Sequence, residues 1–252
     1  GIGLIVLNNN KDDSISLEVL DRWREEKRPI ITAHFYYPHL QIPHVVINNV
    51  NSGYLATQHL IAQKHRNIGI ILTGNSLLDM NQEFMFRLEG YKLALAQHQL
   101  PLVADNLVIV SGENESEKMG YEGMERLLSL ENPPTAVVAT SDVKAFGAIE
   151  AINNAGFKVP EDISIIGIDD IPLSKYYSPA LTTINQNSFK LGERSVELLE
   201  EYAMTLHEEQ DELLKVDLNE LKWLFDGHPI RYGRMFKKVK AGFISNNVKM
   251  AI

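Results

Sequence analysis

The sequence predicts an α/β fold built on mainly parallel sheets. Short apolar runs alternate with segments of helical spacing from the first residues to about residue 206. The clearest run, residues 163–168, is rich in isoleucine, lies between two prolines, and ends in Asp169 and Asp170. Such a run is typical of a parallel strand covered on both faces. Because ligands bind beyond the carboxyl ends of such strands, at the switch point of the sheet, we expect Asp169 to meet a ligand. The alternative is that both aspartates cap the segment that starts at Pro172.

The composition indicates a globular protein and excludes several classes of function. The 252 residues suffice for one large or two ordinary domains, and 44% of them are hydrophobic. The net charge of -9 disfavours binding of nucleic acid by this chain. The absence of cysteine excludes disulfides and thiolate chemistry. No stretch approaches the roughly 20 apolar residues that span a bilayer, so we expect a cytoplasmic protein without a membrane partner.

The first quarter of the chain reads as three strands and two helices. We expect strands at 3–7, 30–33 and 45–47, a helix between about residue 14 and Pro29, and a helix over 54–64. The loop 34–44 holds His34, His39 and His44, but a spacing of five and five matches neither a helical pair nor a short zinc signature. We interpret this loop as an aromatic segment that packs or touches a ligand.

The same alternation continues to residue 206. The expected strands are 68–73, 107–110, 135–139, 163–168 and 181–184, with a further one at 213–218. The expected helices are one that carries Arg87, then 115–130, one from Ser141 or Asp142 to Ala155, and 189–206.

Residues 219–252 form an atypical basic tail. They contain seven lysines and arginines against two acids, whereas the rest of the chain is acidic. A basic tail can bind nucleic acid or membrane surfaces, but this one has neither helical nor strand periodicity, which favours a poorly ordered extension.

No catalytic constellation is visible. The sequence has no Walker loop and no Gly-x-Ser-x-Gly elbow, and Gly1-Ile2-Gly3 lacks the third glycine of a dinucleotide fingerprint. We therefore expect no enzyme, no catalytic residue, no cofactor and no metal.

Several short motifs follow one another in a specific order between Asn48 and about Leu199. They are Val46-Ile47-Asn48-Asn49 with Gly53, Arg87-x-x-Gly90-Tyr91, Ser141-Asp142-x-x-Ala145, Ile166-Gly167-Ile168-Asp169-Asp170, and Pro179-x-Leu181-Thr182-Thr183-Ile184-x-Gln186. In order and spacing they resemble the lactose-repressor/galactose-repressor (LacI/GalR) family of bacterial transcription regulators. Lys64 stands where that family usually has glycine before His65, so we expect this turn to be built differently.

The resemblance implies a type I periplasmic-binding-protein-like fold, in which two parallel-sheet lobes are joined by three crossing strands. Residues 1–48 and 185–206 would form the first lobe, and 49–184 with 213–218 the second. The crossings would be 45–48, 181–184 and a segment near 207–212. Two βα units of the first lobe, and the helix-turn-helix that reads operators, have no counterpart in this chain, so the first lobe is expected to be incomplete.

The resemblance also implies a site between the lobes for a small effector, such as a sugar or nucleobase. Asp169 would accept and Arg87 would donate hydrogen bonds to it. Ser141, in the place of a more usual Asn, would contact the effector weakly or only cap its helix, while Asp142 would be structural. Gln186 would bond ligand or hinge. Tyr177 would be exposed on the monomer and buried in a homodimer.

The function implied is effector binding and dimerisation in a repressor whose operator contacts come from a helix-turn-helix absent from this chain. The alternative is a secreted sugar-binding protein of a transporter. The Asp169-Asp170 pair favours the regulator, since the secreted relatives tend to have Asp-Gly there.

Overall fold

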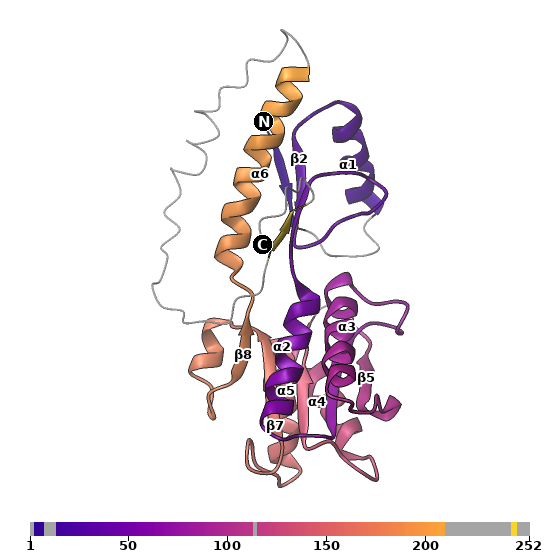
Figure 1. Cartoon of the computed structure of the whole chain (residues 1–252), viewed down its shortest axis with the longest axis vertical. Helices are drawn as coiled ribbons and strands as arrows, with labels where there is room; N and C mark the ends of the chain where they lie inside the picture. Colours follow the sequence, from indigo (N-terminus) through magenta and orange to yellow (C-terminus); the bar gives the residue numbers. More distant parts are fainter. Residues whose placement is uncertain (1–2, 8–13, 113–114, 210–242, 246–252) are drawn as a thin grey trace. The chain divides into compact units, whose positions relative to one another are not determined.

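The computed structural model describes residues 3–7, 14–112, 115–209 and 243–245, which fall into two compact units (Figure 1). The chain passes from the first unit to the second after Ile47 and returns after Asn187. None of the helices within these ranges is long and apolar enough to cross a bilayer. The domain boundaries expected from the sequence remain predictions.

The first unit holds a small sheet with strand order β1-β2-β3-β9. Its elements are β1 (Leu4–Val6), α1 (Ser14–Glu25), β2 (Ile30–Ala33), β3 (His44–Ile47), α6 (Ser188–Glu209) and β9 (Phe243–Ser245). The first three strands are parallel, and β9 pairs antiparallel with β3. A compact core forms where Leu20 of α1 meets Ile30, Leu40 and Ile42.

Two sequence expectations in this unit are corrected. A strand at β9 lies inside the tail 219–252, for which no strand was predicted. Residues 207–209, expected to begin a third crossing, continue α6 instead. Residues 210–212 and the predicted strand 213–218 lie outside the described residues.

The second unit is a five-stranded parallel sheet with strand order β5-β4-β6-β7-β8. In chain order it contains α2 (Asn49–Ala62), β4 (Ile68–Thr73), α3 (Gln82–Gln97), β5 (Leu107–Val110), α4 (Glu117–Leu128), β6 (Ala136–Ala139), α5 (Asp142–Asn154), β7 (Ser164–Asp169) and β8 (Thr182–Asn185). Short 3-10 helices cover Ala104–Asn106 (η1) and Pro172–Lys175 (η2). The α/β fold class predicted from the sequence is confirmed.

Each face of this sheet is covered by one pair of helices. Ile70 and Leu72 of β4 pack with residues of α2 and α3, while Ile71, between them, packs with residues of α4 and α5. This alternation follows from the period of two along a strand. Burial on both faces explains why the strands read as continuous apolar runs.

Helices α4 and α5 approach so closely that their backbones touch. A Cβ added at Gly120 would lie 1.9 Å from the carbonyl oxygen of Lys144, and one at Gly147 would lie 1.7 Å from that of Glu117. No larger residue fits at either position without separating the helices. The two glycines therefore set the position of the first turn of α5, which carries Lys144.

Helix α2 begins at Asn49, five residues before the predicted helix 54–64. The Asn48 side chain accepts a hydrogen bond from the Asn51 amide at 3.0 Å and caps the helix. The polar run before Gly53 had suggested a loop because asparagines also favour turns.

The turn that ends α2 corrects a further expectation. Lys64 adopts φ +73, and its amide donates to the Ile61 oxygen while the His65 amide donates to Leu60. This is the usual left-handed helix ending that favours glycine. The turn therefore has the same backbone conformation that a glycine would give it, and Lys64 adopts a left-handed φ that is strained for a residue with a side chain.

Candidate functional site

Polar side chains gather at the carboxyl end of the second sheet, where its strand order reverses. Strand β5 lies on one side of β4, and β6, β7 and β8 lie on the other, so the switch point is between β4 and β6. The sequence analysis had placed it at β7, one strand away. Thr73 ends β4 and Thr140 follows β6, so both hydroxyl side chains flank the switch point.

The side chain of Arg87, on helix α3, extends to this end of the sheet. It is 2% exposed, its Nε donates to Asn49 Oδ1 at 2.9 Å, and its Nη1 donates to the Thr140 carbonyl. Its Nη2 lies 3.7 Å from Asp169 Oδ1, and its guanidinium carbon stands 5.5 Å from the centre of the Phe84 ring. A buried cation needs such partners, and these hold the guanidinium plane in one orientation.

Asp169 ends β7 in a strained conformation. Its φ is +133 and that of Asp170 is +57, a region of backbone conformation that costs roughly 1–3 kcal/mol for residues other than glycine. Burial raises the pKa of Asp169 to about 7, and the Arg87 charge opposes that rise. The Asp169 side chain remains 27% exposed. The carboxylate is thus partly desolvated yet reachable.

Asp170 is tied to the neighbouring strand. Its Oδ2 accepts from Asn185 Nδ2 at 2.6 Å, and its amide donates to Thr183 Oγ1 at 3.2 Å. Of the two adjacent carboxylates, that of Asp170 is therefore bonded to β8, whereas that of Asp169 lies beside Arg87.

Ser141 and Asp142 are both fully buried. The Ser141 hydroxyl accepts from the Lys144 amide at 3.3 Å and caps α5, the second of the two roles expected for it. The Asp142 carboxylate accepts from the Ile171 amide at 2.9 Å and from the hydroxyls of Ser174 and Thr183, both at 2.5 Å. Burial raises the pKa of Asp142, while these three hydrogen bonds oppose the rise. Asp142 therefore pins the loop after β7 to α5.

Gln186 lies just beyond β8 and is 3% exposed. Its Nε2 has no hydrogen-bond partner among the described residues. A buried donor without a partner costs about 1–3 kcal/mol, so this amide is a group that a ligand can satisfy.

Lys144, which the sequence analysis did not single out, occupies the switch point. It is 0% exposed, and its Nζ donates to Thr73 Oγ1 at 2.8 Å and to Thr140 Oγ1 at 2.9 Å. It also pairs with the Glu115 carboxylate and lies 3.9 Å from the centre of the Phe84 ring. Burial lowers the pKa of Lys144, and the Glu115 charge opposes this. The one available sequence signal was a lysine inside an otherwise apolar helix turn.

The sequence analysis expected Tyr177 to be exposed on the monomer, but the structure shows it half-buried. Its ring stacks on Phe146 with centroids 4.5 Å apart, and its hydroxyl donates to the Phe146 carbonyl at 3.4 Å. Tyr177 is half-buried because Phe146 receives it. The exposed apolar side chains of this segment are Tyr176, at 75%, and Leu173, at 49%.

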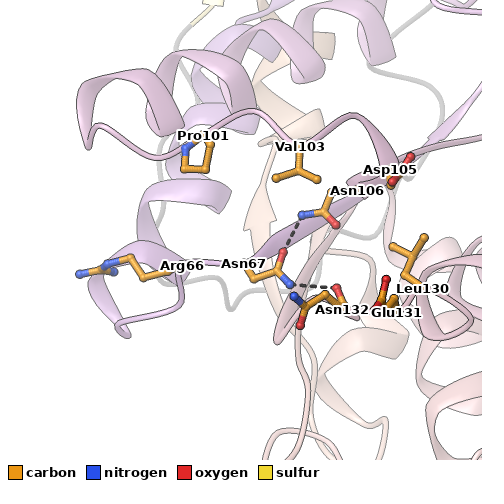
Figure 2. A pocket seen from close by; sticks show the side chains of 9 residues that line it. All are labelled: Arg66, Asn67, Pro101, Val103, Asp105, Asn106, Leu130, Glu131 and Asn132. Atoms are coloured by element: carbon orange, nitrogen blue, oxygen red, sulfur yellow. Dashed lines mark hydrogen bonds between the residues drawn. The ribbon is translucent and has the colours of Figure 1, made fainter.

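A cavity of about 490 Å³ lies at the opposite, amino end of the sheet (Figure 2). Asn106 Nδ2 donates to Asn67 Oδ1 at 2.7 Å, and Asn67 Nδ2 donates to the carbonyls of Asn132 and Pro133 at 3.1 and 3.0 Å. These amides satisfy one another across the strand starts, which is typical of a structural network.

The aromatic loop before β3 packs on itself. Tyr36 stacks on His44 with centroids 4.7 Å apart, and His44 Nδ1 lies 3.1 Å from the Ile42 carbonyl. Within the described ranges, no three His, Asp or Glu side chains gather as metal ligands do.

Comparison with known proteins matches residues 57–218 to the periplasmic binding protein-like domain. The chain is 42% identical over 155 residues to the HTH-type transcriptional repressor PurR of Actinobacillus pleuropneumoniae serotype 3, covering 62% of this chain and 44% of that protein. It is 39% identical over 171 residues to the ribose operon repressor of Haemophilus influenzae, covering 68% and 49%. The chain thus spans less than half the length of these curated relatives.

Solved structures agree with these sequence relatives. A LacI transcriptional regulator of Bacillus cereus superposes with a TM-score of 0.70 at 26% identity, covering 81% of this chain and 69% of that one. A LacI family regulator of Enterococcus faecium, with bound ribose, superposes with a TM-score of 0.66 at 30% identity, covering 79% and 70%.

Proposed function

The chain belongs to the periplasmic binding protein-like domain family, in the form found in LacI/GalR regulators, and from that premise we propose that it is the effector-binding and dimerisation part of a bacterial repressor. It acts in the cytoplasm and carries no enzymatic activity. Its effector is a sugar or another small molecule rich in hydroxyl groups, and the repressor contacts its operator through a helix-turn-helix.

The pairing of Arg87 with Asp169 carries this proposal. A polyhydroxylated ligand needs a charged donor and a charged acceptor held on rigid elements. The guanidinium is held by Asn49 and Thr140, and the Asp169 carboxylate faces it at 3.7 Å with a quarter of its side chain exposed. Gln186 Nε2, which has no hydrogen-bond partner in the described part of the chain, supplies a further donor at the end of β8. Ser141 stabilises α5 as its N-cap.

The names of the relatives favour a regulator over a transport protein. Both curated relatives described above are repressors, and both solved structures are regulators. In the homodimer, we assign the contact to the segment around η2, where Leu173 and Tyr176 are exposed and Tyr177 is half-buried.

Calorimetric titration against a panel of neutral aldopentoses and aldohexoses tests the effector site. We expect one sugar to bind, and Asp169→Asn and Arg87→Ala each to weaken it by about thirtyfold to a thousandfold. Removing one charged partner from a desolvated hydrogen bond typically costs about 2–4 kcal/mol.

Asp162→Asn is the matched control for charge removal, because the Asp162 carboxylate is exposed and accepts from the Lys158 amide far from the site. It should leave the affinity unchanged. Unchanged affinity in both Asp169→Asn and Arg87→Ala, with the fold intact by circular dichroism, would falsify the proposed site.

A further inference from the structure

Two ion pairs stand side by side at the switch point. Arg87 pairs with Asp169, and Lys144 pairs with Glu115. Both cations bind Thr140, Arg87 at its carbonyl and Lys144 at its hydroxyl, and both lie over the ring of Phe84. The pairs therefore form one continuous charged cluster.

The cations of this cluster lie behind its carboxylates. The Lys144 side chain is 0% exposed and that of Arg87 is 3% exposed, whereas those of Asp169 and Glu115 are 27% and 33% exposed. An ammonium group has three N–H donors, and those of Lys144 are taken by Thr73, Thr140 and Glu115. A ligand arriving from solvent therefore meets acceptor oxygens before it meets a positive charge.

The negative charge at this end of the sheet is not balanced. Asp142 and Asp170 stand beside the cluster, so four carboxylates face two cations. After burial, the charges of Glu115 and Asp142 add to the rise in the pKa of Asp169. With all four carboxylates ionised, this end of the sheet would carry two more negative than positive groups.

We propose that Glu115 is a second ligand-binding carboxylate and that the effector carries a basic amino group beside its hydroxyls, as an amino sugar does. This inference rests on the proposed function and names the ligand class for the same site. The ammonium of the ligand bonds Glu115 from the side opposite Lys144. A phosphate or carboxylate on the ligand would face the oxygen atoms of Asp169 and Glu115, and all three donors of Lys144 are already taken, so anionic sugars are rejected.

The test is a titration of the 252-residue chain with sugars that differ only in charge. For each aldopentose and aldohexose of the panel, the neutral sugar, its 2-amino derivative and its terminal phosphate are compared by calorimetry. We expect one amino sugar to bind about tenfold or more tightly than its neutral parent, and its phosphate not to bind, because a charge-assisted hydrogen bond is added or an anion is opposed.

Glu115→Gln removes the proposed partner of the amine. In this variant we expect the amino sugar to lose its advantage, so that the ratio of its affinity to that of the neutral sugar falls to about one. Glu117→Gln, two residues away on the exposed first turn of α4, removes the same charge and should keep the full preference.

A second variant covers the case in which Glu115→Gln fails to fold around a buried ammonium. The double substitution Glu115→Gln with Lys144→Met removes both charges of the pair and should likewise abolish the amine preference.

Three results overturn the inference. They are an amino sugar that binds no tighter than its neutral parent, a sugar phosphate that binds as tightly as either, and an amine preference that survives both Glu115 variants. In each case a sugar still binds, so the proposed function stands. If no member of the panel binds, the proposed function fails and the inference fails with it.

Discussion

Asp169 is a carboxylate whose protonation differs between the folded and unfolded chain. Its pKa rises from 3.8 to about 7 on folding, mainly through burial. Between about pH 4 and pH 7 the folded chain keeps a proton that the unfolded chain has lost. Stability should therefore fall as pH rises through this window, by at most about 1.4 kcal/mol per pH unit, and level off above it.

Urea unfolding between pH 4.5 and 7.5 measures this effect. Asp169→Asn cannot titrate, so its stability should depend less steeply on pH. Some slope should remain because burial also raises the pKa of Asp142. Equal slopes for the parent chain and Asp169→Asn would show that Asp169 is not the titrating group.

At the level of single residues, the sequence pointed to candidate site residues that follow a strand or belong to a motif. Asp169 was singled out because it follows an apolar run, and Arg87 because it belongs to the Arg87-x-x-Gly90-Tyr91 motif. Lys144 escaped notice because helical spacing shows which residues share a face but not how deep one lies. Its partners, the Thr73 hydroxyl and the Glu115 carboxylate, come from distant parts of the chain.

At the level of secondary-structure elements, backbone strain lies in the residues that end the helices. Lys64 after α2, Gln99 after α3 and Gly156 after α5 have φ values of +73, +55 and +86. Each closes its helix with the same pair of backbone hydrogen bonds. Only α5 uses the residue type that adopts this conformation without strain.

Lys64→Gly and Gln99→Gly should each therefore raise stability by about 0.5–1 kcal/mol, and Gly156→Ala should lower it by a similar amount. Chemical denaturation of the three variants measures the effect. Space does not limit Gly156→Ala, because nothing lies within 4 Å of an added Cβ.

Glu125→Gly, at an exposed position inside α4, is the matched control for the glycine itself. It should destabilise by about 1 kcal/mol, since glycine inside a helix costs backbone entropy. If Lys64→Gly destabilises as Glu125→Gly does, the left-handed ending is not strained.

Most of the strands were located by sequence to within one or two residues because they are buried on both faces and bounded by proline, glycine or asparagine. The start of α2 was missed because Asn48 serves equally well in a turn or as a helix cap. The strand β9 was missed because its pairing with β3 joins segments nearly 200 residues apart, which no local pattern records.

Across the whole molecule, the two units differ in how their sheets are covered. Strands β4 and β6 are interior strands buried on both faces, whereas β1 is the edge strand of its sheet and only half-buried. Hydrogen exchange followed by mass spectrometry should find the slowest amides in β4 and β6 and faster exchange in β1. Equal protection in residues 3–7 and 136–139 would contradict this.

At this scale, periodicity predicted the fold class, and the resemblance supplied the two-lobed arrangement. Neither identified the switch point correctly. Strand order depends on which neighbours each strand pairs with, and an apolar run such as 163–168 looks the same at the centre of a sheet or one strand away.

The buried ammonium at the switch point has an evolutionary consequence. A lysine codon lies one base from a methionine codon, and a methionine at position 144 would keep the length of the side chain while removing its charge. Glu115 would then lose the cationic partner that it has among the described residues and would need one from the ligand. In the proposed site, the step from preferring amines to requiring them is thus one substitution, at a side chain that is fully buried.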